Sequence, residues 1–245
     1  MDPTKGSVAV IGAGDYIGAA IARRFAAGGY RVHAGRRTAD KLAALKAEIE
    51  AAGGVCTVRG LDARSEEDVT AFLAQAEADA PLRAVIFNVG ANVSFPVLDT
   101  TERVFRKVWE MACYAGFLAG REGGRLMVPR GEGAIFFTGA TASVRGGVGY
   151  AAFASAKAGL RAVAQSMARE LGPKGIHVAH LIIDAGVDTA FVRDRIKARG
   201  VDPAALPADT LMDPASIAET YWTLFTQPRD AWTFELDLRP FGETW

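Results

Sequence analysis

The chain has 245 residues, half of them hydrophobic and 23% charged, which is the composition of a soluble globular protein with a large core. Lysine plus arginine and aspartate plus glutamate number 28 each, so no net charge attracts nucleic acid or an acidic membrane surface. These numbers predict neither a nucleic-acid nor a membrane partner.

The first residues of the chain and its two cysteines indicate the compartment in which we expect the protein. The first residues contain no long apolar region of the kind that a secretory signal needs, and no stretch approaches the roughly 20 continuous apolar residues of a membrane span. Cys56 and Cys113 have neither metal-binding nor disulfide spacing. We therefore expect a cytoplasmic protein with reduced thiols and no metal site.

Short apolar runs alternate along the chain with longer helical stretches. The runs predict strands within residues 7–14, 31–36, 55–63, 82–92, 133–143, 176–184 and 232–241. Glycine pairs and caps such as Thr38 and Ser65 predict helices at residues 16–30, 38–54, 65–80, 101–128 and 150–172. Strands separated by helices indicate parallel βαβ units covered on both faces. The predicted fold is a single-domain, Rossmann-like α/β doubly wound parallel sheet of about seven strands, spanning residues 1–245.

Three glycines, Gly12, Gly14 and Gly18, join the first strand to the first helix in "VIGAGDYIGAAIA". Glycines here permit a tight turn and let the backbone approach a pyrophosphate at the positive end of the helix. They also close ordinary strand–helix turns, but their place between the first strand and the first helix favours a dinucleotide site.

The end of the second strand bears on the identity of that dinucleotide. A carboxylate there would bind a ribose 2′-hydroxyl, whereas this chain has Arg36 and Arg37, with no acid expected nearby to repel a phosphate. Guanidinium groups pair bidentately with a 2′-phosphate, so we predict NADP(H) rather than NAD(H). The alternative is a pair of solvated arginines before a helix.

From Val8 to about Phe241 the chain resembles the classical short-chain dehydrogenase/reductase family. The motifs that carry the resemblance are "GAGDYIG", in which Tyr16 replaces a family glycine, "LDA", "NVGA", "YAAFASAKAGL" and "IIDAGVDT". The resemblance implies a small-molecule substrate, a homo-oligomer, and a cofactor that contacts residues of these motifs and the two arginines. By position the cofactor-binding residues are Gly12, Gly14, Tyr16, Ile17, Gly18, Arg36, Arg37, Asp62, Ala63, Asn88, Val89, Gly90, Lys157, Asp184 and Thr189.

The chemistry of this family uses four residues, of which this chain keeps one. In the family a Tyr protonates the carbonyl oxygen, and a Lys lowers the pKa of that Tyr and binds the nicotinamide ribose. A Ser polarises the carbonyl, and an Asn anchors a relay water. The matching positions here are Phe153, Lys157, Ala140 and Ala112. The chain is similar to a subgroup of the family with Phe in place of the Tyr, and the usual carbonyl-reducing machinery is expected to be absent.

Other side chains near these positions offer hydroxyl groups. Tyr150 lies on about the same helical face as Lys157 but roughly 10 Å before it along the axis. We therefore expect Tyr150 to be a substrate-mouth or packing residue rather than a relay acid. The remaining hydroxyls are on Thr138, Thr141 and Ser143, whose pKa values are too high for efficient proton donors, and on Tyr16 and Tyr114, which are expected to fill space.

The end of the sixth strand and the segment after it carry weaker signals. Asp184 replaces a family proline and would act as a general acid only if burial raised its pKa, so a loop-capping role is expected. His33, His177 and His180 are expected to be structural. Residues 189–212 are expected to form a substrate lid.

Three functions remain open from the sequence. The first is an NADP(H)-dependent oxidoreductase whose acceptor needs little acid catalysis, such as an imine or a conjugated double bond. The second is a catalytically silent NADP(H)-binding or regulatory protein. The third is a cofactor-independent lyase or dehalogenase, against which the paired arginines argue.

Overall fold

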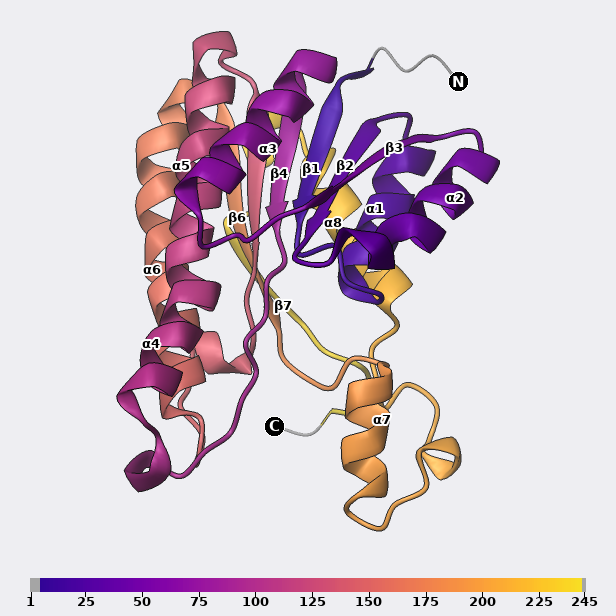
Figure 1. Ribbon diagram of the computed structural model, residues 1–245, viewed down its shortest axis with the longest axis vertical. Coiled ribbons are helices and arrows are strands. Elements are labelled where there is room, and N and C mark those ends of the chain that lie inside the picture. Colours follow the sequence, from indigo (N-terminus) through magenta and orange to yellow (C-terminus); the bar gives the residue numbers. More distant parts are fainter. Residues whose placement is uncertain (1–4, 244–245) are drawn as a thin grey trace.

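The predicted apolar runs form one seven-stranded sheet in the order β3-β2-β1-β4-β5-β6-β7, with every neighbouring pair parallel (Figure 1). The structure, a computed structural model, describes residues 5–243. The strands are β1 (Ser7–Ile11), β2 (Arg31–Arg36), β3 (Val55–Gly60), β4 (Leu82–Phe87), β5 (Gly133–Thr138), β6 (Ile176–Ile183) and β7 (Glu235–Leu238). The predicted sheet, including its seventh strand, is confirmed.

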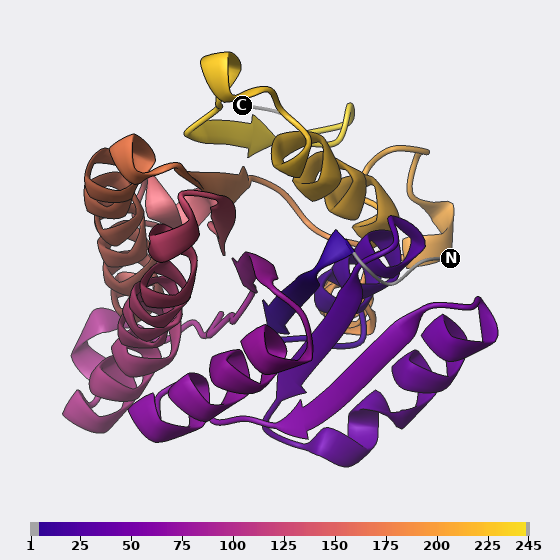
Figure 2. The ribbon, with the colours of Figure 1, turned by 90° about the horizontal axis from the view of Figure 1, so that it is seen from above.

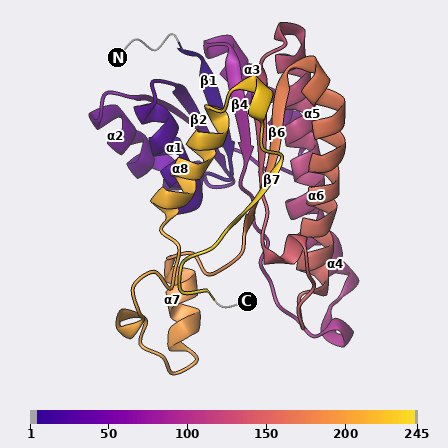
Figure 3. The ribbon, with the colours of Figure 1, turned by 180° about the vertical axis from the view of Figure 1, so that it is seen from behind.

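Helices cover both faces of this sheet, as Figure 2 shows from above. They are α1 (Ile17–Ala27), α2 (Ala43–Ala51), α3 (Glu66–Asp79), α4 (Glu102–Trp109), α5 (Ala115–Met127), α6 (Ala151–Leu171), α7 (Ala190–Lys197) and α8 (Pro214–Phe225). Alternate residues of each strand face opposite sides. Val8 and Val10 pack with α1, α2 and α8, whereas Ala9 and Ile11 pack with α3, α5 and α6. Helix α4 packs on α6, and α7 stands apart beyond the carboxyl ends of the strands (Figure 3).

Strand β1 lies where the strand order reverses, with β2 on one side and β4 on the other. The residues after β1 and β4 are joined, because the Asn88 backbone N–H donates to the Ile11 carbonyl at 2.8 Å. The Asn88 side-chain amide also donates to the Gly12 carbonyl at 3.1 Å. In an open parallel sheet, ligands bind beside such a reversal at the carboxyl ends of the strands. The fold therefore brings the glycine turn to this edge.

The helices differ from the sequence expectations in three places. The span predicted as one helix, 101–128, contains a π-helical segment, Glu110–Tyr114, between α4 and α5. Helix α8 was not predicted at all, although its buried residues complete the core beside α1. Ser65 caps α3 as expected, but Thr38 makes no side-chain capping bond, and a 3₁₀ turn precedes α2. Within residues 5–243, no helix has both the length and the apolar composition needed to cross a membrane.

Candidate active site

A pocket of about 730 Å³ lies at the carboxyl edge of the sheet. Its walls come from the loops after β1, β4, β5 and β6 and from α6 and α7. The predicted site residues that line it are Gly12, Gly14, Tyr16, Ile17, Gly18, Asn88, Val89, Gly90, Ala140, Tyr150, Phe153, Lys157 and Thr189. The predicted residues that do not line it are Arg36, Arg37, Asp62, Ala63, Ala112 and Asp184.

The glycine turn has the shape of a phosphate cradle. Gly12 has a φ of 90°, and a Cβ there would lie 2.7 Å from the Asn88 carbonyl oxygen. A Cβ at Gly18 would lie 2.3 Å from the Gly12 carbonyl oxygen, whereas Gly14 faces open space. No side chain caps α1, and its first turn contains no acid. The helix N-terminus therefore presents its positive end to the pocket with no side-chain cap and no acid in its own first turn.

The two arginines lie beside this cradle, outside the pocket wall. Arg36 Nη1 donates to the Asp15 carboxylate at 2.6 Å. The expectation that no acid lies nearby was therefore wrong, since Asp15 is distant from Arg36 along the chain and the turn brings it back. The side chain of Asp15 is 64% exposed, so an anion that approaches from solvent can compete for Arg36. Arg37 makes no ion pair with a carboxylate in the described residues.

Asp62 forms an ion pair with Arg64, two residues further along the chain. Its carboxylate accepts hydrogen bonds from Arg64 Nε at 2.9 Å and Nη2 at 2.6 Å, and these bonds hold the pKa of Asp62 below its ordinary value. Asp62 lines a smaller hollow that it shares with Tyr114. Tyr114, expected near the cleft, stacks instead on Trp109 and Phe117.

Lys157 is the retained member of the family's catalytic set, and it is 2% exposed. Its Nζ donates to the Thr138 carbonyl at 2.7 Å and to the Val89 carbonyl at 3.2 Å, so it joins α6 to the loops after β5 and β4. Burial lowers the pKa of Lys157 to about 8. An ammonium has three N–H donors, and these two carbonyls occupy two of them.

Phe153 replaces the hydroxyl of the family with an apolar surface. The ring is 6% exposed and belongs to a cluster that also contains Ala112, Cys113 and Ala156. Ala112 is fully buried within the π-helical segment and does not reach the pocket, whereas Ala140 lines the pocket wall. At these three positions the pocket therefore offers no side-chain proton donor.

Two hydroxyls near Lys157 are already paired. Thr138 donates to Asn88 Oδ1 at 3.0 Å, and the Tyr221 hydroxyl lies 2.6 Å from Thr138 Oγ1. Burial raises the pKa of Tyr221 above its ordinary value, which makes that hydroxyl a poor acid. These contacts brace the loop after β4 against β5 and α8.

Asp184 is a buried, ion-paired carboxylate. It accepts hydrogen bonds from Thr141 at 2.5 Å and Arg239 at 3.0 Å, and Arg145 lies 3.3 Å away. Burial alone would raise the pKa of Asp184, but these donors and positive charges outweigh it and lower the pKa. Asp184 is therefore no general acid; it ties the loop after β5 to the C-terminal segment. Asp184, which was predicted to contact the cofactor, does not line the pocket.

A serine, a histidine and a glutamate form a chain behind the pocket. Ser143 Oγ lies 3.4 Å from His180 Nε2, and His180 Nδ1 lies 3.0 Å from Glu235, which Arg161 also binds. The order is that of a hydrolase triad. However, Ser143 is 3% exposed and His180 fully buried, and burial lowers the pKa of His180 to about 4. With no access for substrate, this arrangement is structural.

Tyr16 does more than fill space. Its hydroxyl accepts a hydrogen bond of 2.9 Å from the backbone N–H of Ala190, at the start of α7. Thr189 caps the same helix end, accepting from the Val192 N–H at 3.1 Å. The tyrosine that replaces a family glycine thus fastens the segment after β6 to the glycine turn.

The far half of the pocket contains residues that the sequence analysis did not single out. Helix α7 and the turn after it contribute Phe191, Val192, Arg195, Ile196 and Arg199. Tyr150 faces them, and its hydroxyl accepts a hydrogen bond from Arg195 Nη2 at 3.1 Å. Part of the signal was present in the sequence, since positions 191 and 195 are four residues apart and share one helical face, with Arg199 in the turn that follows.

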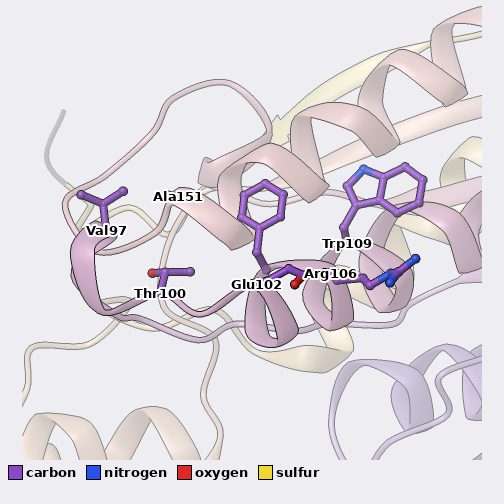
Figure 4. A pocket seen from close by; sticks show the side chains of 7 residues that line it. Val97, Thr100, Glu102, Arg106, Trp109 and Ala151 are labelled. Carbon is purple, nitrogen blue, oxygen red and sulfur yellow. The ribbon is translucent and has the colours of Figure 1, made fainter.

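A second hollow, of about 600 Å³, lies on the outer side of α4 (Figure 4). Val97, Thr100, Glu102, Arg106, Trp109 and Ala151 line it together with Phe105. Val97 and Thr100 come from the segment between β4 and α4, Ala151 from the start of α6, and the other lining residues from α4 itself. None of these residues lines the large pocket. No group of three or more His, Cys, Asp or Glu residues within 5–243 is arranged to hold a metal ion.

A family model described as short chain dehydrogenase matches residues 7–200, which include every residue that lines the large pocket. The chain belongs to this family. Among curated relatives, the 3-oxoacyl-[acyl-carrier-protein] reductase MabA of Mycobacterium tuberculosis is 29% identical over 215 residues, covering 86% of this chain and 82% of that protein. Galactitol 2-dehydrogenase (L-tagatose-forming) of Cereibacter sphaeroides is 33% identical over 174 residues, covering 69% and 67%.

Solved structures of the family superpose on this chain along nearly its whole length. A short-chain dehydrogenase from Rhodopseudomonas palustris has 61% identity and a TM-score of 0.83, covering 96% of this chain and 99% of that one. A metagenomic short-chain oxidoreductase in complex with NADP has 25% identity and a TM-score of 0.80, covering 97% and 98%.

Proposed function

We propose that this protein is an NADP(H)-dependent oxidoreductase that lacks the usual carbonyl-reducing residues of its family. On this proposal it belongs to a subgroup in which Phe153 replaces the catalytic tyrosine and Lys157 is kept. The observation that carries the proposal is the continuity of one pocket from the glycine turn after β1 to Lys157 on α6. The metagenomic relative that binds NADP supports the same cofactor.

The residues present fit a dinucleotide. Gly14 and Gly90 leave open space where a Cβ would stand, and the end of α1 carries no cap or acid. A 2′-phosphate beside β2 would meet Arg36 and Arg37 and would compete with the exposed Asp15 carboxylate for Arg36. Asp62, held by Arg64, would border the adenine end.

Each retained side chain then has a definite task. The bound cofactor supplies the hydride. Lys157, fixed by two carbonyls, would have one N–H donor left to bind a ribose hydroxyl of the cofactor. Phe153 would place an apolar ring at the position of the missing acid, while Tyr16 holds the start of α7 beside the glycine turn.

This arrangement favours acceptors that need no proton donor at the reacting centre. A ketone develops negative charge on oxygen as hydride arrives, and neither Phe153 nor Ala140 can stabilise that charge. An iminium carbon loses its positive charge when it takes hydride and needs no proton. A conjugated carbonyl takes hydride at its outer carbon and becomes an enolate, whose negative charge is shared between the oxygen and the inner carbon. The inner carbon then takes a proton from water.

The test measures NADPH consumption by the purified protein with three acceptors: a cyclic iminium ion, 2-cyclohexenone and cyclohexanone. We expect kcat/KM for the iminium or the enone to exceed that for cyclohexanone by roughly 100-fold or more, the loss typical of a missing oxyanion donor. Rapid reduction of cyclohexanone would contradict the proposal. Tight NADPH binding with no consumption on any acceptor would favour the catalytically silent alternative.

We also propose a homo-oligomer that associates through α4 and α6. Phe105 and Trp109 on α4 are 42% and 41% exposed, and both line the hollow of Figure 4 beside the start of α6. Large exposed aromatics of this kind are enriched at subunit interfaces. Light scattering should give a mass that is a multiple of 25.9 kDa and that falls in Phe105→Ser/Trp109→Ser. A monomeric mass for the unaltered protein would refute the proposal.

A further inference from the structure

The half of the pocket beyond Lys157 is positively charged. Arg145, Arg195 and Arg199 line it. Among the described residues that line the pocket, the one acid is Asp15, which lies at the opposite end and pairs with Arg36. This charge is therefore not neutralised from within the pocket wall.

The three arginines do not contribute equally. Arg145 is 3.3 Å from Asp184, which offsets its charge. Neither Arg195 nor Arg199 forms an ion pair with any carboxylate in residues 5–243. Asp188, an acid just before α7, forms an ion pair with Arg193, which does not line the pocket. The available positive charge thus belongs to Arg195 and Arg199.

Arg195 is held in place for binding. One of its N–H groups donates to the Tyr150 hydroxyl at 3.1 Å, and its guanidinium carbon lies 5.6 Å from the centre of the Phe191 ring. Arg199, four residues further on, acts on the same Tyr150 hydroxyl electrostatically. A guanidinium carries five N–H donors, so a fixed Arg195 keeps several for an oxyanion and loses little rotamer freedom on binding it.

The pocket wall that contains Lys157 and Arg195 also has apolar surface. Phe153, Val192, Ile196, Ala140 and Ala142 contribute it. A ligand that fits this wall has an apolar body and an anionic end.

We infer that this half of the pocket binds an acceptor whose apolar, reducible part lies toward Lys157 and whose carboxylate or phosphate lies against Arg195, Tyr150 and Arg199. The inference rests on the proposed function, because it names the class of acceptor for the same site. Neutral acceptors of the same shape lack the charge-assisted hydrogen bonds and bind less tightly.

The experiment titrates NADPH-saturated protein with benzoate, phenyl phosphate and benzamide in a calorimeter. Benzamide is the neutral counterpart of benzoate, and comparing the two anions tells carboxylate from phosphate. We expect at least one anion to bind roughly 10- to 100-fold more tightly than benzamide, the value of a hydrogen bond to a charged group. Arg195→Gln should abolish this preference, and added salt should weaken it.

Arg193→Gln is the matched control, because it changes an arginine on the same helix that does not line the pocket. It should leave the preference intact. Equal affinity for benzoate, phenyl phosphate and benzamide would overturn the inference, as would failure of both anions to bind. Loss of NADPH affinity in Arg195→Gln would also overturn it, since Arg195 would then serve the cofactor.

The two proposals can fail separately. Suppose that NADPH binds, but benzoate and phenyl phosphate bind no more tightly than benzamide. The anionic acceptor is then excluded, and the cofactor assignment stands. If the protein binds the anions through Arg195 but does not bind NADPH, the proposed oxidoreductase function is refuted, whereas the anion-binding site is supported.

Discussion

Phe153, Ala140 and Ala112 form the point at which this pocket departs from the chemistry of its family. The ring of Phe153 lines the pocket, Ala140 lies on its wall, and Ala112 is buried in the π-helical segment behind it. A tyrosine acid in the family works together with the serine and asparagine at the other two positions. Restoring one hydroxyl leaves the developing charge on a carbonyl oxygen without its second donor.

Phe153→Tyr alone should therefore raise kcat/KM for cyclohexanone by less than roughly tenfold. The triple variant Phe153→Tyr, Ala140→Ser, Ala112→Asn should gain roughly 100-fold or more, because the oxyanion donor returns with the acid. Steady-state NADPH oxidation measures both. Full ketone reduction by the single variant would show that another group already stabilises the oxyanion.

Lys157 predicts a pH dependence of stability. Burial lowers its pKa from 10.5 to about 8, so below pH 8 the folded protein bears the full cost of a buried ammonium. Between pH 8 and 10.5 the folded state releases this proton while the unfolded state retains it, so the free energy of unfolding rises with pH, by on the order of 3 kcal/mol in total.

Urea unfolding at a series of pH values, without cofactor, should show this rise in the unaltered protein and its loss in Lys157→Met. Cys113 is the neighbouring titratable group that acts on Lys157, so Cys113→Ala is the control and should keep the rise. Identical pH profiles for the unaltered protein and Lys157→Met would show that Lys157 titrates as in water.

The helix α7 is fastened at one end by Tyr16 and at its middle by Tyr150. Tyr16 accepts from the Ala190 N–H, and Tyr150 accepts from Arg195. Both contacts join α7 to the walls of the pocket, one on the side of the glycine turn and one on the side of α6. Two tyrosine hydroxyls thus hold α7 against the pocket walls.

Tyr16→Phe keeps the ring and removes one of these hydrogen bonds. We expect NADPH to dissociate roughly 2- to 10-fold faster, in line with the net value of one hydrogen bond. Stopped-flow displacement of NADPH measures the rate. Tyr114→Phe removes a tyrosine hydroxyl that lies in the separate hollow with Asp62 and should leave the rate unchanged. Equal rates in all three proteins would mean that the Tyr16 contact does not restrain α7.

The elements that could be predicted are those with a local cause. Ser65 was identified as a cap because a hydroxyl before an acidic first turn is a local signal. The π-helical segment at Ala112 has no such local signal. A π-helical turn holds one more residue than an α-helical turn, and here that turn packs against α6, a contact that the sequence does not reveal. Each predicted helix follows an apolar strand run. Helix α8 does not directly follow such a run, and its position depends on its contact with α1.

The sheet and the glycine turn could be predicted from the sequence because regular alternation and residue spacing determine them. Contacts between residues far apart in the chain could not. Asp15 reaches Arg36 through the turn after β1, and Arg195 reaches Tyr150 only because α7 lies across the pocket from the start of α6. The oxyanion end of the pocket therefore emerges from tertiary structure, whereas the phosphate end is local.

The whole molecule is a doubly wound sheet whose carboxyl edge joins a phosphate cradle, a buried lysine and a basic far end in one pocket. We propose that this pocket binds NADP(H), with the 2′-phosphate beside Arg36 and Arg37. The most direct test is calorimetric titration of the unaltered protein and of Arg36→Ala/Arg37→Ala with NADPH and with NADH. We expect the unaltered protein to prefer NADPH, and the double variant to lose roughly 10- to 100-fold in NADPH affinity while its NADH affinity changes little. Equal affinities for the two cofactors in the unaltered protein, or no binding of either, would contradict it.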